Sequence, residues 1–129
     1  MKRRPNMMID YELRTRELLQ ESRVPLPELA DLAGVHPRIV ERLARSSEES
    51  VVRIDASCIS RLHDWLILTE LASDAPLPAP TEALVALGNA ALCIQRQARR
   101  SDGLLIKNER AHVLVRAAAR LNAMSKKRK

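Results

Sequence analysis

Aromatic side chains are almost absent from this sequence. It contains no Phe, one Trp and one Tyr, so a hydrophobic core has to be built from Leu, Ile, Val and Ala. Glycine is scarce too, with 3 residues, and few segments alternate apolar and polar residues as half-buried strands do. The apolar residues recur at spacings of three and four, which is the period of a helix. We therefore expect an all-α protein.

Long apolar runs are also missing. No uninterrupted apolar segment approaches the length that crosses a bilayer, and the N-terminal residues MKRRPNMMIDYEL become charged again before a signal-type apolar core forms. These observations predict a cytoplasmic protein that does not insert into a membrane.

Catalytic and metal-binding motifs are missing as well. The sequence has no P-loop, GxSxG, HExxH or CxxC motif, and its three His are scattered. We therefore expect no enzymatic activity, no cofactor and no metal. Cys58 and Cys93 each lie in a helical pattern among apolar neighbours, which indicates reduced, partly buried thiols. His63 precedes Asp64, but adjacent residues of a helix face different directions, so we expect a surface pair rather than an acid–base site.

The charge is positive and unevenly distributed. The formal net charge is +6; residues 1–74 carry 11 Lys and Arg against 13 Asp and Glu, a charge of −2, whereas residues 75–129 carry 11 against 3, a charge of +8. This balance indicates an anionic partner. By itself it does not distinguish a nucleic acid from a membrane surface or an acidic protein.

The segment from Val24 to Leu66 has the pattern of two short helices joined by a glycine turn. The residues with this spacing are Leu29, Ala30, Gly34, Val35, Val40 and Leu43. We expect helices over about residues 27–33 and 37–45. Gly34 suits the left-handed conformation that ends the first, and Ala30 suits a close crossing of the two. Pro37 is favoured at the first helical position, and His36 stands where a cap would lie.

Two further helices complete the first half. One is expected over about residues 7–22, with an inner face marked by Met8, Tyr11, Thr15, Leu18, Leu19 and Ser22. The other follows Asp55, which is a good N-cap because its carboxylate accepts hydrogen bonds from amides of the first turn. Ile59, Leu62 and Leu66 give that helix an apolar stripe, and Trp65 adds the largest single burial available.

Four short motifs resemble the Cro/C1-type (Xre-like) helix-turn-helix domain: Glu28-Leu29-Ala30, Gly34-Val35, Arg42-Leu43 and Ile54-Asp55. The resemblance covers about residues 10–70. It implies a bundle of about five helices in a DNA-binding domain of residues 1–72, with the helix at 37–45 in a major groove. The DNA contacts that it implies are His36, Arg38, Glu41 and Arg42. We add Arg45 and Arg53 to the expected DNA contacts, because they can lie on one basic face with Arg38 and Arg42. Arg38 is the best candidate for a bidentate contact to guanine.

The second half of the chain begins with a proline-rich segment, and two helical patterns follow it. Pro76, Pro78 and Pro80 alternate within residues 73–80, which predicts an extended linker between domains. Residues 81–124 are expected to form an antiparallel helical hairpin, with helices over about 82–100, capped by Thr81, and 104–124, followed by a basic tail of residues 125–129. The residues expected on the inner side of the first hairpin helix are Leu84, Leu87, Ala91, Ile94 and Ala98.

The hairpin is also basic. The residues expected to contact phosphates are Arg96, Arg99, Arg100, Arg116 and Arg120. Two helices alone bury too little surface to be stable, so the hairpin either pairs with a second copy or completes the core of a monomer.

Together these patterns favour a sequence-specific DNA-binding transcriptional regulator, a repressor that binds double-stranded DNA as a homodimer and is nucleoid-associated when bound. The alternative is a protein-interaction adaptor, such as an antitoxin-like or assembly factor. Helix-turn-helix folds also serve as interaction modules, and a half-domain with a charge of −2 is a poor electrostatic partner for DNA.

Overall fold

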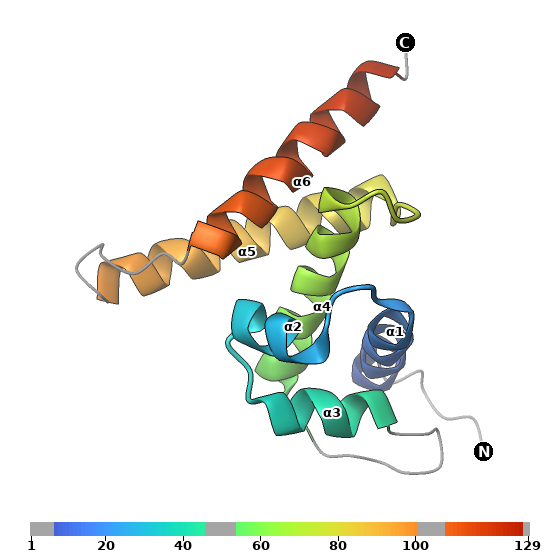
Figure 1. The fold of residues 1–129 in the computed structure, drawn as a ribbon, viewed down its shortest axis with the longest axis vertical. Coiled ribbons are helices and arrows are strands. Elements are labelled where there is room, and N and C mark those ends of the chain that lie inside the picture. Colours follow the sequence, from blue (N-terminus) through green and yellow to red (C-terminus); the bar gives the residue numbers. More distant parts are fainter. Residues whose placement is uncertain (1–6, 46–53, 101–107, 128–129) are drawn as a thin grey trace. The chain divides into compact units, whose positions relative to one another are not determined.

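The computed structural model describes residues 7–45, 54–100 and 108–127, with side chains over 12–45, 54–96 and 110–126 (Figure 1). Within these ranges the chain forms helices and no strand, so the prediction of an all-α protein is confirmed. The helices are α1 (Met7–Glu21), α2 (Leu26–Ala33), α3 (Pro37–Arg45), α4 (Ala56–Ala72), α5 (Pro80–Arg100) and α6 (Asn108–Lys127).

The chain divides into two compact units, Met1–Leu66 and Ile67–Lys129, and the division falls inside α4. The predicted linker at residues 73–80 lies later in the chain. Over its described residues the first half has four helices before residue 73, whereas the resemblance implies about five.

In the first unit, α3 packs against both α1 and α2. The core is aliphatic apart from one indole. Its most buried apolar residues are Leu18, Leu19, Leu29, Ala30, Ala33, Val40, Leu43, Ile59, Leu62, Trp65 and Leu66. The expected burial of Thr15, Leu18 and Leu19 on α1 is confirmed, while the side chains of Met8 and Tyr11 lie outside the described residues.

In its central part, α4 is buried all round. The helix begins directly after Asp55, as predicted, but the hydrogen bond to the Asp55 carboxylate comes from the Ser57 hydroxyl, at 2.6 Å, rather than from an amide. Every residue from Leu62 to Thr69 is buried. A helix that is buried on all sides is a core helix rather than an amphipathic surface helix.

In the second unit, α5 and α6 pack against each other, and Figure 1 shows that the chain reverses direction between them. The buried residues of α5 are Ala83, Ala86, Ala90 and Ile94, and Ala117 of α6 is fully buried. Small side chains let packed helix backbones approach closely, which suits a mostly alanine interior.

This face differs from the one expected. Ile94 is buried as predicted, but Leu84 is 57% exposed and Ala91 is exposed as well; Leu87 is half-buried, and the side chain of Ala98 is not described. The expectation was wrong because it assigned the largest apolar residues to the interior. The helix is rotated by about one residue, and its alanines face inward.

The ends of the two helices also differ from the predictions. Helix α5 begins at Pro80, where the carbonyl of Ala79 accepts a hydrogen bond from the amide of Ala83, so Thr81 lies in the first turn and is not the cap. Proline fits the first helical position because it has no amide to satisfy. Helix α6 continues to Lys127, into the predicted tail, whereas its predicted start at Leu104 lies outside the described residues.

The predicted linker is packed into the second unit. Ala75 and Pro78 are buried, and the Ser73 hydroxyl donates to the carbonyl of Glu70 while accepting from the amide of Ala75. Residues 73–79 are not helical, as the alternating prolines predict, but they belong with α5 and α6 and do not form a free spacer.

Candidate nucleic-acid interface

The connection between α2 and α3 is a tight turn at Gly34. This residue has φ 68° and ψ 37°, the left-handed conformation that glycine adopts without a steric penalty. The amide of Val35 donates to the carbonyl of Ala30 at 2.9 Å, and the amide of Gly34 donates to that of Asp31 at 3.3 Å. These two bonds close the end of α2 in the Schellman pattern. The left-handed conformation predicted for Gly34 is confirmed, and Ala30 is buried.

The start of α3 is capped by His36. Its Nδ1 accepts a hydrogen bond from the amide of Arg38 at 3.1 Å, and Pro37 takes the first helical position. An imidazole nitrogen that accepts has no hydrogen, so in this geometry the neutral ring carries its proton on Nε2. The cap predicted at this residue is confirmed. The side chain of His36 is exposed.

The other end of α3 is held by α1. The side-chain amide of Gln20 donates from Nε2 to the carbonyl of Ala44 at 3.1 Å, which satisfies one of the carbonyls left open at a helix end. Between the two ends, Val40 and Leu43 are fully buried. Helix α3 is therefore fixed at its start, at its end and along its inner face.

The outer face of α3 is basic. Arg38, Arg42 and Arg45 are exposed and lie at positions i, i+4 and i+7, which places them on one side of the helix, opposite Val40 and Leu43. Glu41 is exposed beside them. We call these four residues the α3 outer face. It carries three positive charges and one negative charge within nine residues of helix.

Some of the other predicted DNA and phosphate contacts lie outside the described residues, and others are exposed. Arg53 lies outside the described residues, as do the side chains of Arg99 and Arg100, which end α5. Arg96 on α5 and Arg116 on α6 are exposed.

Arg120 has a structural position that its sequence neighbours do not indicate. Its guanidinium is half-buried: Nη1 donates to the carbonyls of Glu70 and Leu71, both at 3.2 Å, and Nη2 donates to that of Ala75 at 3.3 Å. A cation is favoured at the end of a helix, where carbonyls lack intrahelical partners. Arg120 therefore caps α4, and the prediction that it contacts phosphate is dropped.

The pair His63 and Asp64 is buried, which contradicts the expected surface location. Their exposed fractions are 5% and 6%, and His63 Nδ1 lies 3.5 Å from Asp64 Oδ1. The prediction assumed that α4 has one solvent face, and this helix has none here. The run Trp65-Leu66-Ile67-Leu68, which follows directly, is the sequence signal that indicates burial on all sides.

The described residues contain no group of three or more His, Cys, Asp or Glu placed to hold a metal ion. Cys58 and Cys93 are free and half-buried. Among the helices of the described ranges, none is long and apolar enough to cross a membrane.

Comparison of the chain with models of known protein families, with curated proteins and with solved structures found no match.

Proposed function

We propose that the protein is a sequence-specific DNA-binding transcriptional regulator of the Cro/C1 helix-turn-helix type, a repressor that acts as a dimer in the cytoplasm. The observation that carries this proposal is the α3 outer face. Three exposed arginines lie on one side of a short helix whose opposite side and both ends are fixed by Val40, Leu43, His36 and Gln20.

This arrangement suits a major groove. A guanidinium can donate two parallel hydrogen bonds to O6 and N7 of guanine, and such a contact discriminates well only if the arginine comes from a rigid support. Arg38 lies in the first turn of α3, the part of a recognition helix that meets base edges. Arg42 and Arg45 follow along the same side and suit phosphate contacts. Glu41 supports selectivity, since a carboxylate accepts from cytosine and is repelled by phosphate.

In this proposal the basic second half of the chain contributes phosphate contacts and does not read the base sequence. Residues 75–129 have a formal charge of +8, and Arg96 and Arg116 are exposed. Contacts of this kind neutralise phosphates without distinguishing bases, so they raise the affinity for all DNA sequences and make it depend on salt.

A second candidate function, a protein-interaction adaptor, is favoured by a different observation. Helix α5 exposes Leu84, Val85 and Leu92, and the first half of the chain has a charge of −2. An adaptor would use the apolar surface for a partner protein and would leave DNA unbound.

The test is selection of bound DNA from a random pool with the full chain, followed by titration of the selected site. We expect an enriched palindrome. Arg38→Ala should lose about 1–3 kcal/mol of binding free energy on that site and relax the preference at one base position.

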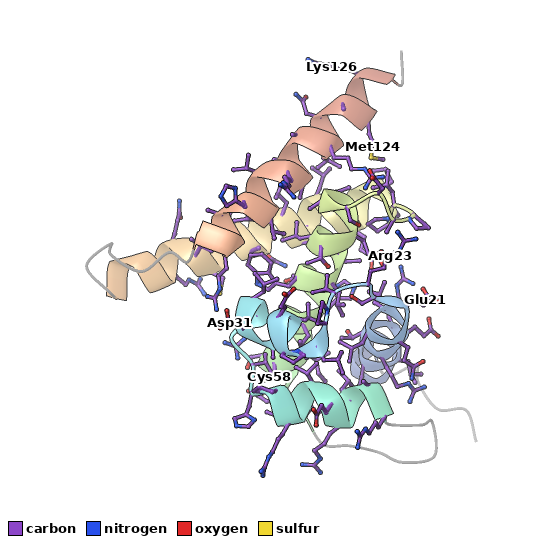
Figure 2. The ribbon with its side chains drawn as sticks, in the orientation of Figure 1. Glu21, Arg23, Asp31, Cys58, Met124 and Lys126 are labelled. Atoms are coloured by element: carbon purple, nitrogen blue, oxygen red, sulfur yellow. The ribbon has the colours of Figure 1, made fainter. Side chains whose placement is uncertain are left out.

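Arg23→Ala is the control, since it removes the same charge elsewhere. Figure 2 shows Arg23 beyond the end of α1 and away from α3, and its side chain is exposed. Absence of any enriched sequence, with no retention on heparin, would favour the adaptor.

A further inference from the structure

Helix α5 has an apolar face that the described residues of its own unit leave exposed. Leu84 is 57%, Val85 55% and Leu92 54% exposed. Gly88 is exposed as well, and it lies at the middle of this face, on the side of the helix opposite the buried Ala86 and Ala90. We call Leu84, Val85, Gly88 and Leu92 the α5 outer stripe.

Within the described residues of the second unit, no contact accounts for a glycine at position 88. A Cβ added there meets no described atom within 4 Å, so a larger side chain would fit. Glycine in the interior of a helix weakens it relative to alanine. Where a glycine is flanked by large apolar residues on an open face, its physical advantage is the close approach of another backbone.

We propose that the α5 outer stripe is a self-association surface, and that its occupant is α5 of a second copy of this chain, crossing in the antiparallel direction at Gly88. The stripe is symmetric about this residue: Leu84 lies four residues before it and Leu92 four residues after. An antiparallel copy therefore brings Leu84 of each chain level with Leu92 of the other, and the stripe is complementary to itself.

Charge supports the antiparallel direction. Glu82 lies in the first turn of α5 and Arg96 lies beyond Leu92, toward the other end. Antiparallel pairing places the basic end of each helix near the acidic first turn of the other, and it opposes the two helix dipoles. Parallel pairing would place arginine beside arginine.

This inference deepens the proposed function, since it names the contact that would join two DNA-binding units on a paired site, but the association itself does not depend on DNA. It is therefore measured on the full chain without DNA, so that failure of the dimer and failure of DNA binding are separate results.

The first experiment is sedimentation equilibrium of the full chain. We expect a monomer–dimer equilibrium. Gly88→Glu and Leu92→Glu should each raise the dissociation constant roughly tenfold or more, because a carboxylate would be buried at the crossing. Circular dichroism should show unchanged or higher helix content in Gly88→Glu, since glutamate is a better helix former than glycine.

The control is Ala119→Glu, at an exposed position of α6 outside the stripe. A monomeric full chain, or a Gly88→Glu dimer as tight as the original, would overturn the proposal.

The second experiment determines direction by disulfide formation in a Cys58→Ala, Cys93→Ala background, with Leu84→Cys and Leu92→Cys on separate chains that are then mixed. Because a disulfide requires short Cα distances, antiparallel pairing predicts Leu84→Cys chains linked to Leu92→Cys chains. Gly88→Cys chains should link to themselves. Links only between identical positions 84 and 84, or 92 and 92, would indicate parallel pairing and would contradict the inference.

Discussion

Two arginines one turn apart on α6 have different environments. Arg116 is exposed, whereas Arg120 donates to three backbone carbonyls, two in the last turn of α4 and one beyond its end. The sequence shows the same residue type at a four-residue spacing and cannot separate them. The difference depends on Glu70 and Ala75, which are 50 and 45 residues away along the chain.

Replacement of Arg120 should therefore destabilise the fold. We expect Arg120→Ala to lower the free energy of unfolding by about 1–3 kcal/mol, because charge-assisted hydrogen bonds to half-buried carbonyls are lost. Arg120→Lys should recover only part of this, since one ammonium cannot span carbonyls that a planar guanidinium reaches with two nitrogens. Urea unfolding measures both variants. Arg116→Ala is the control and should stay within about 0.5 kcal/mol; equal losses at the two positions would contradict the capping role.

His36 is expected to combine a structural role with a binding role, and two substitutions separate them. His36→Leu removes the acceptor of the Arg38 amide and should cost about 1 kcal/mol of stability. His36→Asn supplies a good cap acceptor and should preserve the melting temperature while removing the Nε2 donor. If His36→Asn retains the affinity for the selected DNA as well, the side chain makes no contact with DNA.

Helices with local start and stop signals were predicted well. For α2 and α3, proline at the start, glycine in the turn and buried residues at helical spacing are all short-range features, and α3 was predicted with its observed bounds. The inner face of α5 was predicted wrongly because Leu84 and Ala83 are equally compatible with a helix. Which of them faces inward depends on packing in the folded protein, and no local signal encodes that packing.

The turn at Gly34 allows a test of the connection between α2 and α3. Gly34→Val should lower stability by about 1–2 kcal/mol, because a β-branched residue is strained at the observed positive φ. Gly34→Asn should cost less, since asparagine tolerates this conformation. Thermal unfolding of the two variants gives the comparison, and identical melting temperatures would show that the left-handed turn is not maintained in solution.

For the whole molecule, the sequence predicted the contrast between a nearly neutral first half and a basic second half, but not where the chain divides. The alternating prolines indicated a boundary at residues 73–80, yet the division lies between Leu66 and Ile67. Proline restricts the backbone locally and does not determine which distant residues a segment packs against. The hydrogen bonds from Arg120 attach this segment to α6, and they connect residues that no local pattern relates.

The basic second half gives a prediction about salt. If Arg96 and Arg116 contact phosphates, Arg96→Gln and Arg116→Gln should each reduce the slope of log affinity against log salt by about 0.9 and weaken selected and unrelated DNA alike. Binding titrations over a range of salt concentrations measure this, with Arg23→Gln as the control. An unchanged slope in both variants would restrict DNA contacts to the first unit.

In α5, the small buried alanines should tolerate substitution less well than the large exposed leucines. Ala83 and Ala86 are fully buried, so any larger side chain overpacks the contact and costs about 1–3 kcal/mol, whereas the exposed Leu84 and Leu92 can be exchanged for polar residues at little cost to folding. A lineage under selection for folding alone would keep its alanines and lose its leucines by drift. Descendants that retain the leucines would reveal a selective pressure that a single folded chain does not impose.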